Sequence, residues 1–206
     1  RVGVRGYTVT TGVWVRGILN SVYGVDLDQV TWVLSGDEHV AEYVAPSNVE
    51  TADSGDLRAM LASGEIDAAI GAPASDSPDI QPLIPDARAA GAEYFGNTGI
   101  YPINHSIVVR NDVLEENPWL AKELFTMFTA AKRTYLESVR SNRDDMNSAD
   151  KALMDVTEIV GDDPLPYGLV SSMPALEALI QFCVDQQVIP EKVEPEQVFA
   201  PSTLTL

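Results

Sequence analysis

The segment from Gly6 to Gly12 combines hydroxyl groups with two glycines where an expected strand passes into an expected helix. Free amide groups and the positive end of the helix dipole at such a junction favour an anion. Glycine lets a ligand come close to the backbone. The pattern therefore suits capture of a carboxylate or another small anion, and ordinary threonine capping of a helix explains it equally well. The candidate binding residues are Tyr7, Thr8, Thr10 and Thr11.

Two basic side chains lie close to this segment in the sequence. Arg16 is expected two turns inside the helix, and Arg5 precedes the segment. Either guanidinium would help to hold an anion at the helix start. The alternative is an arginine bonded to surface carboxylates, an arrangement that contributes little energy.

The chain has two histidines, and each is a candidate acid or base. His105 precedes an expected strand, where an imidazole acts as a proton donor or packs and bonds to a backbone carbonyl. Asn104 beside it is a candidate binding residue. His39 is the alternate acid, and together with Asp37 and Glu38 it could also bind a metal. The two histidines lie far apart in sequence, without the helical pair typical of zinc enzymes, so we expect no metal site.

Several common kinds of site are missing from the sequence. It contains neither the glycine-rich phosphate loop with its lysine nor the G-x-S-x-G turn of serine hydrolases. Cys183 is the single cysteine, so no disulfide forms within the chain. It lies in an apolar run, which favours a buried core thiol.

Composition excludes further classes of function. The 206 residues include 31 acidic and 13 basic ones, a net charge of −18. Such a surface repels phosphate backbones and anionic lipid, so we expect neither nucleic-acid binding nor membrane association. Abundant acid and few lysines fit a protein of a salt-rich cytoplasm, or simply a soluble one. No apolar run is long enough to cross a membrane.

The hydrophobic pattern predicts an α/β protein. Residues 2–4, 30–34 and 66–70 are expected strands, and helical spacing at 13–21 and 57–61 falls between them, ended by Gly24 and Gly64. Strands that alternate with helices predict a parallel sheet. Asp53 or Ser54 is the expected cap of the second helix. Further along, strands are expected at 80–84 and 106–110, and helices at 118–139, near Leu153 and at 174–187.

Several blocks of sequence resemble the 4,5-dihydroxyphthalate decarboxylase family. The most specific are Tyr7–Trp14, within a longer match over Arg5–Leu19, and Asn104–Arg110. Weaker matches follow the same order, at Trp32–Val33, Glu38–Val40, Gly64–Ala68, Asp163–Gly168 and Phe199–Thr203. The resemblance covers nearly the whole chain.

This resemblance implies a fold similar to type II periplasmic binding proteins, with two α/β lobes of parallel or mixed sheets flanked by helices. Residues 1–97 would form the second lobe, 98–103 the hinge or crossing, and 104–206 the returning part of the first lobe with a C-terminal tail. Gly96–Gly99 would then be a hinge strand or its approach. The family has a further half-lobe upstream with no match here, so the first lobe is expected to be incomplete and the N-terminus truncated.

The resemblance also implies a carboxy-lyase that decarboxylates a small aromatic acid between the lobes without an organic cofactor. His105 would supply the proton, with His39 as alternate, and the binding residues above would be joined by Tyr167. The alternative is a solute-binding protein for a small organic anion that works with an ABC permease; another metabolic enzyme on this fold stays open. An enzyme would be cytoplasmic, and a receptor periplasmic or extracellular. A homodimer is expected if a sheet edge is exposed.

Overall fold

The computed structural model describes residues 1–38, 40, 42–53, 55–72 and 76–206. The chain divides into two compact units. Unit 1 comprises residues 1–87 with 178–192, and unit 2 comprises residues 88–177 with 193–206. The expected lobe boundaries at 97 and 104 stay a prediction.

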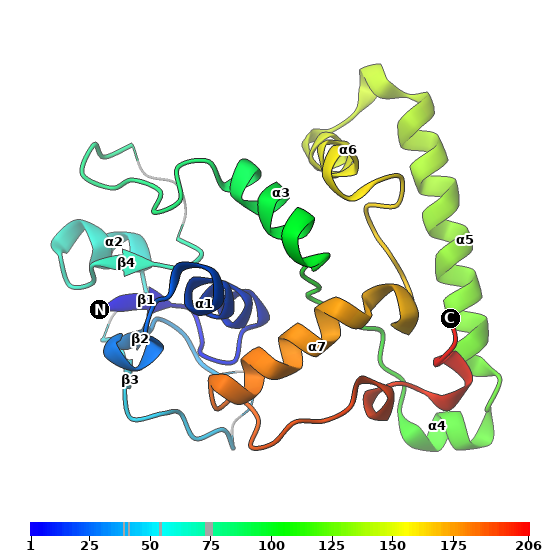
Figure 1. Cartoon of the computed structure of the whole chain (residues 1–206), viewed down its shortest axis with the longest axis horizontal. Helices are drawn as coiled ribbons and strands as arrows, with labels where there is room; N and C mark the ends of the chain where they lie inside the picture. Colours follow the sequence, from blue (N-terminus) through cyan, green and yellow to red (C-terminus); the bar gives the residue numbers. More distant parts are fainter. Residues whose placement is uncertain (39, 41, 54, 73–75) are drawn as a thin grey trace. The chain divides into compact units, whose positions relative to one another are not determined.

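Unit 1 contains a parallel four-stranded sheet in the order β3-β2-β1-β4 (Figure 1). Its strands are β1 (Val2–Val4), β2 (Trp32–Leu34), β3 (Val49–Thr51) and β4 (Ala68–Ala69). Each is short, and β1 pairs on one side with β2 and on the other with β4. The expectation of a parallel α/β unit is confirmed, whereas β3 was not predicted.

The two faces of this sheet have separate apolar cores. Trp32 and Leu34 pack with Val4 on one face, while Val33 points to the other and packs with Leu57 and Met60. Helix α1 (Thr10–Tyr23) connects β1 to β2, and α2 (Leu57–Ser63) lies between β3 and β4. The two connections run in opposite directions along the sheet, so right-handed crossovers place their helices on opposite faces. The carboxyl ends of β1 and β4 therefore meet where the strand order reverses, a point at which open α/β sheets bind ligands.

The helix stops predicted in unit 1 are confirmed, and one cap is corrected. Gly24 and Gly64 both follow their helices in the left-handed conformation, with φ of 68° and 76°. Helix α2 is capped by Asp56, whose carboxylate accepts from the amides of Arg58 and Ala59. The expected cap Asp53 lies too early in the chain, and Ser54 is outside the described residues.

Among the residues described for unit 2, every regular element is a helix or a 3₁₀ turn, and irregular segments connect them. Its long helix α5 (Leu120–Ser141) and α6 (Ser148–Val160) confirm two of the predicted helices. The last helix, α7 (Leu169–Asp185), begins five residues before Pro174 and continues into unit 1. The other helices and 3₁₀ turns of the chain are η1 (Leu27–Gln29), α3 (Ala87–Thr98), α4 (Asn111–Glu116), η2 (Arg143–Asp145), η3 (Pro195–Val198) and η4 (Pro201–Thr203).

Three strand predictions are wrong. Residues 106–110 pair with no described strand, and the side chains of Ile107 and Val108 are 67% and 87% exposed. Their β-branched sequence is typical of a strand, but a strand also requires a neighbouring backbone. Residues 80–84 are irregular, with a bend at 83–84 and no strand. Gly96–Gly99 was expected to be a hinge strand or its approach; residues 96–98 are the last turn of α3, so the strand is wrong, and the hinge stays a prediction.

None of the described helices combines the length and apolar character needed to cross a bilayer.

Candidate functional site

The segment predicted to bind an anion holds a carboxylate of the chain itself. We call residues 5–12, which run from the end of β1 into the first turn of α1, the elbow. The amides of Tyr7 and Thr8 both donate to the Glu38 carboxylate, the latter at 3.0 Å. The Thr8 hydroxyl donates to Glu38 Oε2 at 2.6 Å. The elbow therefore presents three converging donors to one carboxylate, an arrangement of charge-assisted hydrogen bonds.

Strand pairing explains how Glu38 reaches the elbow. Val4 lies opposite Leu34 in the parallel pair β1–β2, so the residues after each strand emerge at the same edge of the sheet. The backbone amide of Ser35 donates to Val4 O at 2.9 Å. A Cβ at Gly6 would lie 3.2 Å from Val9 Cγ2 and in ordinary contact with the Asp37 carbonyl oxygen at 3.4 Å, so the two loops lie side by side here.

The threonine-capped helix, the alternative explanation of this segment, is not formed. The N-cap of α1 is Val9, which offers no side-chain hydrogen bond, and Thr10 and Thr11 are the first two helical residues. The amide of Val9 donates to Gly6 O in a turn. The threonine that bonds outward from the elbow is Thr8, and its partner is Glu38 rather than the helix.

A cavity of about 240 Å³ adjoins the elbow within unit 1. It lies where the chain leaves β1 and β4, the reversal point of the strand order. The first turn of α1 contributes Thr11 and Gly12 to its wall, so the positive end of the helix dipole lies at this cavity. The described residues that line it are Val4, Arg5, Gly6, Val9, Thr11, Gly12, Leu57, Ile70 and Gly71.

Arg16 lies behind the elbow and is fully buried, with 0% of its surface exposed. Its guanidinium carbon is 4.0 Å from the centre of the Tyr7 ring and 5.4 Å from that of Trp32. Burial lowers the pKa of Arg16, and the charges of neighbouring acidic groups oppose that shift. The surface arginine considered as an alternative is thus wrong.

Tyr7 contributes its backbone rather than its ring to the elbow. The residue is 3% exposed, and its ring stacks on Tyr43 with centroids 6.3 Å apart. Burial raises the pKa of the Tyr7 phenol, so its hydroxyl keeps its proton.

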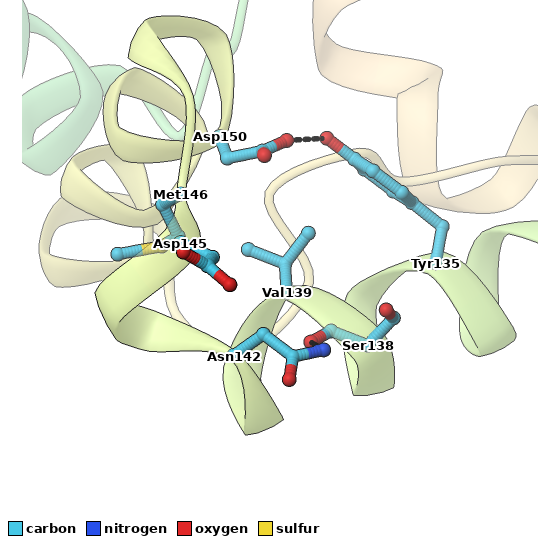
Figure 2. A pocket seen from close by; sticks show the side chains of 7 residues that line it. All are labelled: Tyr135, Ser138, Val139, Asn142, Asp145, Met146 and Asp150. Atoms are coloured by element: carbon cyan, nitrogen blue, oxygen red, sulfur yellow. Dashed lines mark hydrogen bonds between the residues drawn. The ribbon is translucent and has the colours of Figure 1, made fainter.

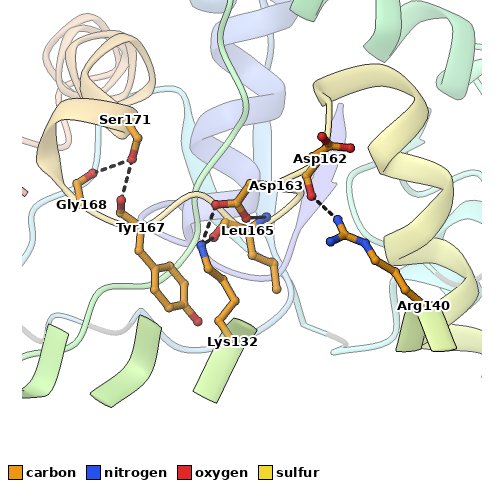
Figure 3. Close-up of polar contacts among 8 residues, drawn as sticks. All are labelled: Lys132, Arg140, Asp162, Asp163, Leu165, Tyr167, Gly168 and Ser171. Carbon is orange, nitrogen blue, oxygen red and sulfur yellow. Dashed lines mark hydrogen bonds and ion pairs between the residues drawn. The ribbon is translucent and has the colours of Figure 1, made fainter. Parts of the chain in front are cut away.

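Three of the other predicted site residues, Asn104, His105 and Tyr167, belong to unit 2. Asn104 and His105 are exposed in the extended segment before residue 106. Tyr167 is 39% exposed, and Lys132 Nζ lies 4.4 Å from its ring centre. Figure 3 shows that Lys132 of α5 binds the loop that carries Tyr167. Lys132 Nζ donates to Asp163 Oδ2 at 2.7 Å and to the Leu165 carbonyl at 2.8 Å.

A larger cavity of about 380 Å³ lies in unit 2, and its chemistry does not suit an anion. Figure 2 shows Tyr135 donating to Asp150 across it, and this bond raises the pKa of the tyrosine. Asp145 is a second carboxylate in the wall, so a bound anion would meet like charge. The described residues that line it are Tyr135, Ser138, Val139, Asn142, Asp145, Met146 and Asp150.

Sequence reasoning missed the role of Glu38. It considered Glu38 as a neighbour of His39 and as a metal ligand, but not as a partner of the elbow. The available signal was the parallel pairing of residues 2–4 with 32–34, which brings residues 5–8 and 35–38 together. His39 lies outside the described residues. Among the residues that the structure describes, no group of three histidine, cysteine or acidic side chains could hold a metal.

Comparison with known proteins identifies two relatives, although no family model matches the chain. The 4,5-dihydroxyphthalate decarboxylase of Comamonas testosteroni is 27% identical over 99% of this chain, which covers 67% of that protein. A protein of the same name from Pseudomonas putida is 35% identical over 46% of the chain, a match that spans 42% of that protein. The resemblance of this chain to the 4,5-dihydroxyphthalate decarboxylase family is therefore confirmed.

Proposed function

We propose that the chain is part of a non-oxidative decarboxylase of a small aromatic dicarboxylate, of the 4,5-dihydroxyphthalate kind. The observation that carries the proposal is the carboxylate seat of the elbow, where Tyr7 and Thr8 already hold Glu38. Three donors that converge on one internal carboxylate suit the carboxylate of a ligand equally well. The names of the two relatives support the same substrate class.

In this proposal, the carboxylate that the substrate retains displaces Glu38 from its seat. The adjoining cavity then receives the aromatic ring, because Val4, Val9 and Leu57 give its wall an apolar part. Thr11 and Gly12 place the first turn of α1 beside the same space. An apolar wall beside the ring also reduces the water near the bond that breaks.

The reaction needs one proton and no oxidant. A ring hydroxyl para to the leaving carboxylate pushes electron density into the ring, and an acid protonates the carbon that bears this carboxylate. The bond to the carboxylate then breaks, its electron pair restores the aromatic ring, and CO₂ leaves. The carbon has exchanged CO₂ for a proton, so atoms and electrons balance.

His105 is the proposed proton donor, and His39 is the alternate. A well-placed general acid contributes about 10²–10⁴-fold to a rate. We expect His105→Gln to lose turnover by that order while substrate binding survives. Unchanged turnover in His105→Gln would remove the residue from this role.

The deciding experiment incubates the purified protein with 4,5-dihydroxyphthalate and follows CO₂ release and retained ligand together. Release of CO₂ supports the decarboxylase, and tight retention without release overturns it in favour of a solute receptor. Thr8→Val removes one donor to the seat and should raise KM. Thr51→Val, at an exposed position on β3, is the matched control.

A further inference from the structure

Arg16 is a buried cation without a close counter-ion. Its Nε donates to Gln186 Oε1 at 2.7 Å, and its Nη2 donates to the Tyr7 carbonyl at 2.6 Å. Nη1 has no hydrogen-bond partner among the described residues, and none of the ion pairs found there includes Arg16. Because a buried charge is costly unless it is compensated, this arrangement requires an explanation.

The explanation lies in the peptide unit that joins Tyr7 to Thr8. Its carbonyl oxygen accepts from Arg16 Nη2, and its N–H donates to Glu38 Oε2 at 3.0 Å. The guanidinium and the carboxylate thus bind opposite ends of one peptide group. Hydrogen bonds linked in this way polarise each other, so the cation strengthens the N–H as a donor.

Other contacts keep the guanidinium in this position. Gln186 is 3% exposed and fixes Nε through its Oε1, while its Nε2 donates to the Val13 carbonyl at 2.9 Å. The Tyr7 ring covers the guanidinium. Gly12 leaves room for Nη1, which would lie only 3.0 Å from a Cβ at that position.

We propose that Arg16 is a positioning residue of the carboxylate seat, which it serves through the Tyr7–Thr8 peptide without touching the ligand. It orients this peptide and keeps the seat positive, so that the seat selects ionised carboxylates over neutral groups of the same shape. Glu38 is the resting counter-charge, and the substrate carboxylate takes its place. This inference rests on the proposed function, because it assumes that the elbow binds the substrate.

The test compares benzene-1,2-dicarboxylate with its neutral diamide, using calorimetric binding to the wild-type protein, Arg16→Lys and Arg16→Gln. Loss of a hydrogen bond to a charged group typically lowers binding affinity by about 10-fold or more. We expect the affinity of Arg16→Gln for the dicarboxylate to fall by about that factor, and its affinity for the diamide to change little. Arg16→Lys, which keeps the charge, should recover much of the preference. Equal losses for both ligands would indicate a merely structural role and overturn the inference.

A second variant keeps the inference testable if Arg16 variants do not fold. Gln186→Glu retains Arg16 and the shape of its partner, but places a counter-charge against Nε. We expect dicarboxylate affinity to fall by about 10-fold while diamide binding changes little. Unchanged dicarboxylate affinity in the folded variant would contradict the inference.

The outcome also separates this inference from the proposed function. Arg16-dependent preference for the dicarboxylate without any release of CO₂ supports the positioning role and overturns the decarboxylase. Release of CO₂ by the wild-type protein, with variants that weaken both ligands equally, overturns the positioning role alone.

Discussion

The ring of Phe182 in α7 lies directly against the backbone of Gly17 in α1. A Cβ at Gly17 would come within 2.2–2.6 Å of three ring carbons. The same ring meets Trp14 edge-on, with centroids 5.7 Å apart. The absence of a side chain at residue 17 therefore allows α7 to pack closely against α1. One turn earlier in α1, the Val13 carbonyl accepts a hydrogen bond from Gln186.

Gly17→Ala should destabilise unit 1, because the added methyl group overlaps the Phe182 ring. Overpacking of this kind costs about 1–3 kcal/mol, more than the helix propensity that alanine gains. Urea unfolding measures the change. Gly91→Ala is the matched control, because no atom lies within 4 Å of a Cβ at this helical glycine. A Gly17→Ala protein as stable as Gly91→Ala would contradict the packing described here.

Glu38→Gln should lower the stability of the folded protein in the absence of ligand and raise its affinity for a dicarboxylate. The amide loses charge-assisted hydrogen bonds to Tyr7 and Thr8, each worth about 1.5–3 kcal/mol. The same change removes the internal competitor for the seat. Thermal unfolding with and without benzene-1,2-dicarboxylate measures both effects.

Asp37→Asn provides the control for Glu38→Gln, since it removes the same charge one residue away. We expect its unfolding to respond to the dicarboxylate as in the wild-type protein. If Glu38→Gln binds the dicarboxylate less tightly than Asp37→Asn does, Glu38 is a partner of the ligand and not its competitor.

Local sequence was enough to predict most of unit 1. Short β-rich runs, the helical spacing between them and Gly24 and Gly64 after the helices predicted β1, α1, β2, α2 and β4. Each of these signals is contained within a few residues. Strand β3 was missed because Val49–Thr51 is three residues long and largely exposed, so no buried pattern marks it.

The elements that failed depend on partners far away in the sequence. Residues 106–110 have the composition of a strand, but composition cannot supply the neighbouring backbone that makes one. In the candidate site, too, local features were predictable and features that depend on distant residues were not. The anion-binding character of the elbow was predictable from its glycines and threonines, whereas its occupation by Glu38 depends on the register of β1 with β2.

Lys132→Met should destabilise unit 2 by about 1–3 kcal/mol, because a largely buried ammonium group loses three contacts. The lysine side chain is 10% exposed, and it binds Asp163, the Leu165 carbonyl and the face of Tyr167. Arg88→Met removes an ion pair to Glu158 in which both side chains are more than half exposed. Exposed pairs contribute about 0–1 kcal/mol, so this control should change stability little. Equal effects of the two substitutions on urea unfolding would contradict the difference in burial.

The stability of unit 1 should fall as the pH rises from 10 towards 12, and Tyr43 is one cause. Burial, followed by the nearby Tyr7 and Glu38, raises the pKa of Tyr43 from 10.0 to about 12. Its hydroxyl donates to the Gln187 carbonyl, a bond that requires the proton. Between these two pH values the folded protein retains a proton that the unfolded chain has released. The contribution is therefore complete below pH 10 and is lost as the pH rises through about 12.

Tyr43→Phe tests this assignment, because phenylalanine does not titrate. Urea unfolding across the same pH range should show a shallower decline in the variant than in the wild-type protein. A residual decline is expected, since burial also raises the pKa of Tyr7 and acts in the same direction. Tyr23→Phe, at a tyrosine that is 50% exposed, controls for the loss of a hydroxyl. An identical pH dependence in Tyr43→Phe and the wild-type protein would show that the Tyr43 phenol does not contribute.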